Sequence, residues 1–341
     1  ERFDGSARAA IEALPGLATK AGRNRNLRPP PPDVIQREID ASAKFGARLI
    51  ASCEPDYPPA LAAVGPPPPL VCVKGDTSLF RKTGIAIVGA RNASAVGRKM
   101  ARTLAGDLGR EGFIIVSGLA RGIDGEAHAA ALATGTIAVL AGGIDQPYPP
   151  QHRELYDAVI EQGLVISEAA FGYTATARDF PKRNRIISGL SMSTLVIEAA
   201  ERSGSLITAR MALEQGREVM AVPGSPLDPR AQGSNRLIKQ GAALIETAED
   251  VIRQMEGLAA PDLFEPSGAG FAHEGSPAEV PAALVEAVRE ALSPTPTPVD
   301  EIVRVVDAPM RLVLAAIAEL ELDGAAVTHV GGLASLSAQA M

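Results

Sequence analysis

Residues 85–97 read Ile85-Ala86-Ile87-Val88-Gly89-Ala90-Arg91-Asn92-Ala93-Ser94-Ala95-Val96-Gly97, and this stretch decides the fold. Four apolar residues end at a glycine, a short polar turn follows, and a segment of helical length over 96–108 comes next. A strand that is apolar at every position is typical of a sheet covered on both faces. The stretch therefore predicts a buried strand that leads through a tight turn into a helix.

The same order of strand, glycine turn and helix recurs along the chain. Further strand-like runs cover 70–73, 113–116, 136–140, 164–166, 194–197 and 218–222. Helix-length segments between them cover 123–133, 151–162 and 206–215. Because apolar strands alternate with helices that can act as crossovers, the sequence predicts an α/β fold with a doubly wound, mostly parallel sheet.

The flanking regions predict three further parts of the chain. We assign 1–45 to a small helical N-terminal segment, 46–255 to the α/β domain, 256–280 to a linker and 281–341 to a winged-helix domain. The last assignment rests on helix-length segments at 282–292, 299–306 and 309–322, followed by strand-like runs near 326–330 and 333–336. Three helices and a two-stranded wing are the pattern of a winged helix.

Charge is distributed unevenly over the 341 residues, whose formal net charge is −7. Residues 81–241 carry 19 basic and 15 acidic side chains, a net charge of +4. Residues 242–280 carry 1 basic and 8 acidic side chains, and residues 281–341 carry 3 basic and 8 acidic ones. The negative charge therefore lies in the last hundred residues. The basic middle region permits a polyanion partner, but in a local pocket rather than on a broad basic face.

The composition also indicates the cellular compartment in which we expect the protein. Cys53 and Cys72 do not have the spacing of metal ligands, so we expect two free thiols in a reducing cytoplasm and no bound metal. No apolar run reaches the ~18 residues that span a bilayer, and residues 1–4 lack the apolar core of a signal peptide. Because no initiator Met is present, we expect the sequence to begin inside a longer gene product.

Polar loops follow the predicted strands, at the sheet edge where open parallel sheets bind ligands. The turn after the first quoted strand carries Gly89 and Arg91, and Arg91 occupies the second glycine position of a dinucleotide fingerprint. A guanidinium at that place can hold a phosphate through two hydrogen bonds. Other glycine, hydroxyl, amide and cationic residues in such loops are Ser117, Gly118, Arg121, Gly122, Arg202, Ser203, Gly204, Ser205, Asn235 and Arg236. Their recurrence predicts a phosphate-containing ligand.

Residues 180–185 read Phe180-Pro181-Lys182-Arg183-Asn184-Arg185 and place three cations within four positions. A glycine-broken stretch precedes them and an apolar run follows, so we expect a loop-to-helix junction where backbone N–H groups add to the positive charge. A solvated basic turn is the alternative. Phe180 and Tyr173 are the candidates for stacking on a base, in a chain with no Trp.

Few side chains suit catalysis. Asp124 and His128 are four apart on a predicted helix, but we expect Asp124 to cap that helix and His128 to be a satisfied, half-buried residue. Glu168 and Glu198 follow strands, where we expect them to orient nearby arginines. Metalloprotease, P-loop and nucleophile-elbow motifs do not occur. We therefore expect no catalytic residue and no cofactor.

Several of these runs resemble the DNA processing protein A family, also called DprA or Smf. The matching runs are IVGAR at 87–91, SGLARGIDGEAH at 117–128, FPKRNR at 180–185, SGSLITA at 203–209 and VPG at 222–224. They occur in the family's order over roughly residues 55–245. The resemblance implies an extended Rossmann-like domain that binds single-stranded DNA and loads the RecA recombinase onto it in natural transformation and recombination.

The same resemblance implies the surrounding parts and the contacts. It implies a small helical (SAM-like) N-terminal domain, a C-terminal winged helix, and a homodimer through the Rossmann-like domain. Residues 237–252 alternate apolar side chains with few cations and are a candidate for the dimer patch. Arg91 and Lys182 match family positions that hold the DNA backbone, with Arg183 and Arg185 alongside.

Two departures and one alternative accompany the resemblance. The N-terminal part has room for only part of the usual module, and the winged helix offers only Arg289, Arg304 and Arg311 as cations, so we do not expect it to read duplex DNA. The alternative is a nucleotide phosphoribohydrolase of the lysine-decarboxylase-like (LOG) group. That group carries PGGxGT where this chain has residues 201–206, ERSGSL, and the missing glycine pair favours the DNA function.

Overall fold

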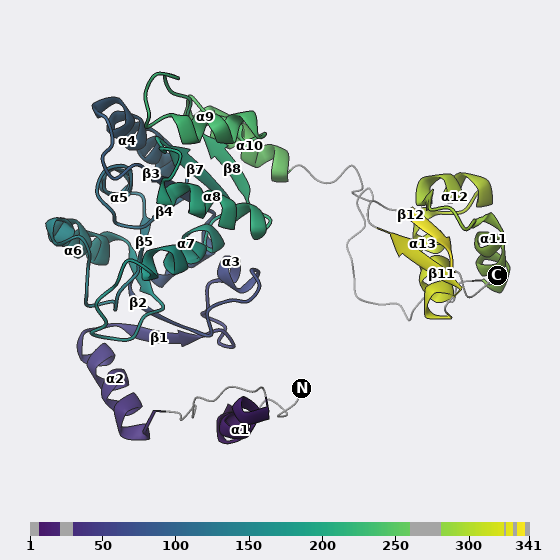
Figure 1. Ribbon diagram of the computed structural model, residues 1–341, viewed down its shortest axis with the longest axis horizontal. Coiled ribbons are helices and arrows are strands. Elements are labelled where there is room, and N and C mark those ends of the chain that lie inside the picture. Colours follow the sequence, from purple (N-terminus) through teal and green to yellow (C-terminus); the bar gives the residue numbers. More distant parts are fainter. Residues whose placement is uncertain (1–6, 21–29, 260–280, 324, 330–332, 338–341) are drawn as a thin grey trace. The chain divides into compact units, whose positions relative to one another are not determined.

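The computed structural model describes residues 7–20, 30–259, 281–323, 325–329 and 333–337. The chain divides into two compact units, Glu1–Asp262 and Leu263–Met341 (Figure 1). Among the described residues, the first unit contains a nine-stranded sheet in the order β1-β2-β6-β5-β4-β3-β7-β8-β9. The predicted α/β fold is confirmed.

The strands of this sheet are β1 (Arg48–Ala51), β2 (Leu70–Gly75), β3 (Gly84–Gly89), β4 (Ile114–Ser117), β5 (Thr136–Leu140), β6 (Leu164–Ser167), β7 (Ser193–Ile197), β8 (Glu218–Ala221) and β9 (Ala243–Leu244). The helices of the first unit are α1 (Ala7–Lys20), α2 (Pro32–Lys44), α3 (Pro59–Ala62), α4 (Ala95–Arg110), α5 (Ile123–Ala131), α6 (Arg153–Gln162), α7 (Asp179–Gly189), α8 (Gly204–Glu214), α9 (Gln232–Lys239) and α10 (Ala248–Ala259). Short 3₁₀ helices cover Thr77–Arg81 and Pro150–His152.

The sheet is parallel from β6 to β9 and antiparallel at one edge. β2 pairs antiparallel with β6, and β1 pairs antiparallel with β2. The sequence did not predict β1 or β9. β1 is an edge strand with one buried residue, and β9 has only two residues, so neither carries a long apolar run.

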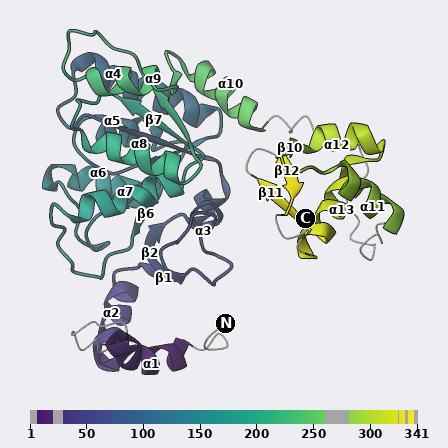
Figure 2. The same cartoon turned by 45° about the vertical axis from the view of Figure 1, so that its right-hand side comes forward.

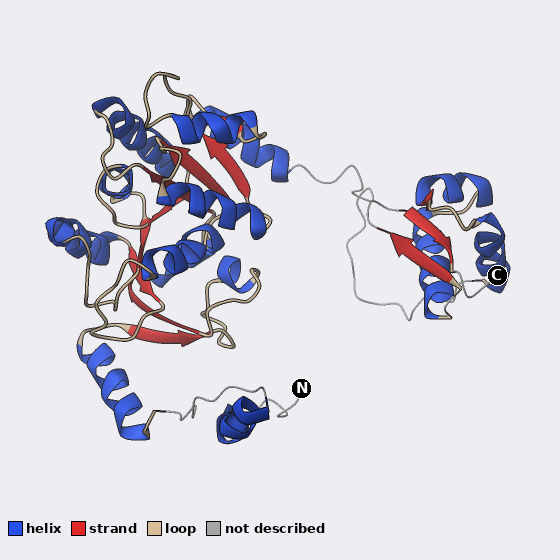
Figure 3. Cartoon of the chain, viewed as in Figure 1, coloured by secondary structure: helices blue, strands red, loops and turns tan. Residues whose placement is uncertain are grey.

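The two faces of the sheet follow from the alternation of side chains along each strand. Ile85 and Ile87 of β3 belong to the core under α4 and α5, whereas Ala86 and Val88 belong to the core under α7 and α8. In Figure 1, α4, α5 and α6 lie to the left of β3, β4 and β5, and α7, α8 and α3 lie to their right; Figure 3 shows these strands in red between the helices. Both faces are covered, which explains why β3 is apolar at every position.

The direction of winding reverses beside β3. After β3 the chain adds β4, β5 and β6 on one side, and then returns to place β7 on the other side. Gly89 at the end of β3 pairs with Ile197 at the end of β7, and a Cβ at Gly89 would lie 1.9 Å from the Ile197 carbonyl oxygen. Only glycine permits this approach. A crevice at such a reversal is the usual ligand site of a doubly wound sheet.

The second unit is a winged helix, as predicted. Its helices are α11 (Ala282–Ala291), α12 (Val299–Val306) and α13 (Met310–Leu322). β11 (Ala326–His329) pairs antiparallel with β12 (Leu333–Leu336), and the two-residue β10 (Thr297–Pro298), which the sequence did not predict, pairs with the other side of β12. Figure 2 labels the three strands beside their helices. Val288, Ile302, Val313 and Ile317 form the centre of this core.

The predicted linker overlaps the end of the first unit. α10 continues to Ala259, so the predicted linker start at residue 256 falls in its last turn. Residues 260–280 lie outside the described residues. No helix among the described residues is long and apolar enough to cross a membrane.

Candidate functional site

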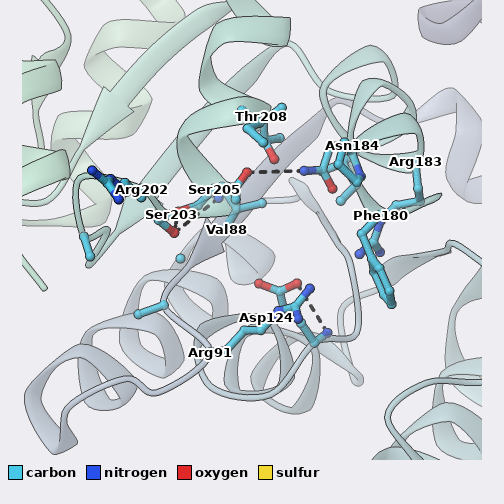
Figure 4. A pocket seen from close by; sticks show the side chains of 18 of the residues that line it. Val88, Arg91, Asp124, Phe180, Arg183, Asn184, Arg202, Ser203, Ser205 and Thr208 are labelled. Carbon is cyan, nitrogen blue, oxygen red and sulfur yellow. Dashed lines mark hydrogen bonds between the residues drawn. The ribbon is translucent and has the colours of Figure 1, made fainter. Parts of the chain in front are cut away.

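A pocket of about 850 Å³ lies at the reversal of winding, and we call it the main pocket. It is bounded by the loops after β3 and β7, the first two turns of α7 and the start of α8 (Figure 4). The residues that line it include Arg91, Phe180, Asn184, Arg202, Ser203 and Thr208. The pocket lies at the carboxyl ends of the strands, where the sequence predicts the ligand site.

The loop after β3 presents Arg91 to the pocket. Gly122 takes φ +79°, and a Cβ there would lie 2.2 Å from the Ala90 carbonyl oxygen, so the loops after β3 and β4 are in close contact. The Arg91 side chain is exposed, and its guanidinium carbon lies 5.1 Å from the centre of the Phe180 ring. This is within the range of a cation–π contact.

Tyr148 extends this row of side chains, and the sequence reasoning missed it. Its ring centre lies 5.5 Å from that of Phe180, and the residue is 54% exposed. Arg91, Phe180 and Tyr148 therefore form a continuous row, which we call the Arg91–Phe180–Tyr148 row. A smaller pocket is lined by the same three residues and by the predicted residues Gly118 and Arg121. The signal in the sequence was an aromatic residue in the loop after the strand at 136–140.

Residues 180–185 lie inside α7 and not at a loop-to-helix junction, because α7 already begins at Asp179. The helical phase sends their side chains in different directions. Phe180 and Asn184 line the main pocket. Lys182, whose side chain is 73% exposed, lines a second pocket of about 300 Å³ with Glu168 and Tyr173. The two predicted backbone-binding cations, Arg91 and Lys182, therefore line two different pockets.

Arg183 is 5% exposed and points to the sheet. Its Nη1 donates hydrogen bonds to the Gly118 carbonyl oxygen at 2.7 Å and to the Val139 carbonyl oxygen. Burial lowers the pKa of Arg183 to about 10, so the side chain remains charged at neutral pH. The guanidinium thus ties α7 to the ends of β4 and β5, and we assign Arg183 a positioning role.

Arg185 is also paired. Its Nη2 donates a hydrogen bond to Glu168 Oε1, and both side chains are about one-third exposed. The expectation that Glu168 orients an arginine is confirmed. Asp124 lies at the edge of the main pocket, where it accepts hydrogen bonds from the backbone N–H groups of Gly118 (3.2 Å) and Ala120 (3.3 Å). Burial raises the pKa of Asp124, and the nearby Arg183 opposes this shift.

The start of α8 forms the opposite wall of the main pocket. Ser203 is the N-cap, and its Oγ lies 2.6 Å from Ser205 Oγ. Asn184 Nδ2 of α7 donates to the Gly204 carbonyl oxygen at 3.3 Å, which links the two walls (Figure 4). Arg202 is exposed beside them. Residues 202–205, predicted as ligand residues, therefore line the same pocket as Arg91.

Other predicted ligand residues lie elsewhere. Ser117 is fully buried and its Oγ donates to the Ile87 carbonyl oxygen at 2.6 Å, so it joins two strands. Asn235 exchanges two hydrogen bonds with the backbone of Gly224 and fixes the loop after β8. Arg236 is exposed and is not among the residues that line the three pockets. The sequence could not separate these from the pocket residues because all of them follow strands.

Three acid–base expectations need correction. Asp124 does not cap α5, whose N-cap is Gly122. His128 is fully buried rather than half-buried and is only partly satisfied: its Nδ1 lies 2.7 Å from Thr136 Oγ1, but its Nε2 has no hydrogen-bond partner among the described residues, and burial lowers its pKa to about 3. Glu198 accepts hydrogen bonds from the backbone N–H and hydroxyl of Ser94, the N-cap of α4, so it anchors a helix start and does not orient an arginine. The described residues contain no cluster of three or more potential metal ligands.

Comparison with known families and proteins gives consistent matches. Residues 48–256 match the family described as DNA recombination-mediator protein A, residues 272–332 match the DprA winged helix domain, and residues 1–41 match the DprA-like N-terminal HHH domain. The DNA processing protein DprA of Bacillus subtilis is 44% identical over 65% of this chain and 75% of its own. Protein Smf of Escherichia coli is 40% identical over 84% of this chain and 77% of its own.

Solved structures of similar proteins agree. DNA processing protein A from Streptococcus pneumoniae superposes with a TM-score of 0.60 at 34% identity, covering 74% of this chain and 95% of that one. The Helicobacter pylori protein superposes with a TM-score of 0.57 at 27% identity, covering 62% and 96%. The description of the latter structure concerns its single-stranded DNA binding mode.

Proposed function

The chain belongs to the DprA/Smf family, and we propose from this premise that it binds single-stranded DNA at the main pocket and passes the strand to a RecA recombinase in transformation and recombination. The observation that carries the proposal is the Arg91–Phe180–Tyr148 row, which places a cation and two aromatic rings at one pocket mouth. An unpaired nucleotide offers a phosphate for the cation and a free base face for a ring. In a duplex the base faces are stacked, so the same row has no matching surface.

We propose further that the strand crosses the first turn of α7. Arg91 lines the main pocket and Lys182 lines the second pocket, and both pockets include Arg183 of α7. A strand held by both cations must therefore pass over residues 179–182. Tyr148 stands beside this path with its ring half exposed, and we assign it as a second stacking platform.

The phosphoribohydrolase alternative has less support. The carboxylate that such an enzyme would need at this place is Glu198, and both of its oxygens accept hydrogen bonds from Ser94. Glu198 is not among the residues that line the main pocket. Incubation with nucleoside monophosphates decides between the two functions: release of free base that is lost in Glu198→Ala would replace the DNA-binding proposal.

Gel shifts at several salt concentrations test the function itself. We expect tighter binding to single strands than to duplexes, and an affinity that falls with salt at a log–log slope of about −0.7 per phosphate neutralised. Only 12 residues of the chain are aromatic, so phosphate contacts must supply much of the affinity. An affinity that does not change with salt, or tighter binding to duplex, would refute the proposal.

Arg91→Ala and Lys182→Ala should each weaken single-strand binding and each reduce the salt slope by about one phosphate contact. The melting temperature should barely change, because both side chains are exposed. Lys82→Ala is the matched control: Lys82 is an exposed cation beside the amino end of β3, at the sheet edge opposite the pocket. If Lys82→Ala weakens binding as much as Arg91→Ala does, the effect is one of overall charge and the site assignment is wrong.

We propose that the first unit forms the homodimer and carries DNA binding, and that the winged helix does neither. Two sites on one strand would raise the avidity without new contacts. A truncation that ends at Ala259, the last residue of α10, should therefore still dimerise and still bind single strands. Light scattering and gel shifts on the truncation test this. If the truncation is a monomer, or no longer binds DNA, the missing property depends on the C-terminal part of the chain and the proposal is wrong.

A further inference from the structure

The main pocket contains a hydroxyl group that the fold itself does not use. Thr208 of α8 is 1% exposed and lines the main pocket. Among the described residues, no donor or acceptor forms a hydrogen bond with its Oγ1. Figure 4 shows the side chain directed from α8 into the pocket. The hydroxyl is therefore free to bond to a group that enters the pocket.

The surroundings of Thr208 indicate the charge of that group. At the start of α8, the hydroxyl groups of the N-cap Ser203 and of Ser205 lie 2.6 Å apart, and the amino end of this 11-residue helix carries the positive end of its dipole. Arg202 lies beside the same turn and Arg91 lies on the opposite loop of the pocket. Hydroxyl donors, a helix amino end and two guanidinium groups together favour an anion with several oxygen atoms.

From these observations we infer that the first turn of α8 and the Thr208 hydroxyl form a seat for one phosphate group of a nucleotide. The inference rests on the proposed function and adds to it a location: the phosphate lies against α8, while the base lies toward the Arg91–Phe180–Tyr148 row. Because Thr208 is 99% buried, only a small group reaches its hydroxyl, and a phosphate oxygen is small enough. The phosphate can be a strand's terminal monoester or one of its internal diesters, and the probes below separate the two.

Thr208→Val tests the seat, because valine keeps the shape of threonine and removes the hydroxyl. We expect it to weaken the binding of thymidine 5′-monophosphate and of a short oligothymidylate about ten-fold, the factor that corresponds to one hydrogen bond to a charged group. Thr208→Ser, which retains the hydroxyl, should restore most of the affinity. Isothermal titration calorimetry on the full chain gives these dissociation constants.

Thr194→Val is the matched control. Thr194 lies in β7, is 0% exposed and likewise has an Oγ1 without a partner, but it lines none of the three pockets. We expect its affinities to equal those of the unaltered chain. A loss of affinity that is confined to Thr208→Val cannot then come from removing a buried hydroxyl in general.

The outcomes separate the seat from the proposed function. A loss seen with a 5′-phosphorylated oligothymidylate but not with its 5′-hydroxyl counterpart assigns the seat to a terminal phosphate, and equal losses assign it to an internal one. If Thr208→Val binds every probe as tightly as the unaltered chain does, the inferred phosphate seat is wrong. This holds even where single-strand binding and its dependence on Arg91 persist. Monophosphate binding that depends on Thr208, without any binding of single strands, retains the seat and refutes the proposed function.

Discussion

Arg183→Met should lower the free energy of unfolding by about 3–5 kcal/mol, because a hydrogen bond from a charged group contributes roughly 1.5–3 kcal/mol and this change removes two of them. The substitution leaves the carbonyl oxygens of Gly118 and Val139 without their donor. It also removes the positive charge that opposes the raised pKa of Asp124. Methionine is long and flexible enough to fill the space, so the loss reports the polar contacts and not a cavity.

Lys182→Met is the matched control for this experiment. It removes the neighbouring cation, which is 73% exposed and makes only a 3.5 Å contact with Asp179, so the free energy of unfolding should remain unchanged. Urea denaturation followed by circular dichroism measures both variants. If Arg183→Met is as stable as the unaltered chain and instead loses single-strand affinity, Arg183 is a ligand of the strand and not a positioning residue.

The second large effect is a loss of stability in acid that depends on His128. This imidazole has a pKa of about 3 in the folded protein, against the ordinary value of 6.5, because burial disfavours its charged form. Below pH 6.5 the unfolded chain therefore binds a proton that the folded chain does not bind until about pH 3. The free energy of unfolding should fall through this window by up to about 1.4 kcal/mol per pH unit, or roughly 3 kcal/mol by pH 4.

His128→Asn isolates this contribution. The asparagine amide can replace Nδ1 in the contact with Thr136 Oγ1, but it does not titrate. Carboxyl groups titrate equally in both proteins, so the difference between their unfolding free energies should be constant above pH 7 and should change in favour of the variant below pH 6. If the unfolding free energies of the two proteins change in parallel from pH 7 to pH 4, the fold does not keep His128 neutral.

The sequence predicted the sheet well because the physical requirement is local. A strand covered on both faces must be apolar at every position, and residues 85–88 satisfy this alone. The antiparallel edge could not be predicted in the same way. β1 has a single buried residue among four, so its pairing with β2 depends on contacts with residues 19 to 25 positions away and leaves no pattern of its own.

The candidate site was predicted as a region but not side chain by side chain. In the sequence, Lys182, Arg183 and Arg185 look equivalent. The phase of α7 separates them: Arg183 lies four residues before Ile187 and seven before Leu190, both buried, and therefore shares their face. That relation was present in the sequence and would have identified Arg183 as buried. Tyr148 and Thr208 had no such signal, because their roles depend on the loops and helices that surround them.

The pairing of β3 with β7 has a consequence for the protein during its synthesis. The main pocket needs Gly89 to Arg91 from one strand end and residues 202–208 from the other, and the hydrogen bonds between Ser94 and Glu198 join residues 104 positions apart. A growing chain on the ribosome thus has no complete pocket until β7 and the first turn of α8 have emerged from the exit tunnel. By then the strands β3 to β6 are available to pair, so the nascent polypeptide completes this pocket late, after most of the sheet has been made.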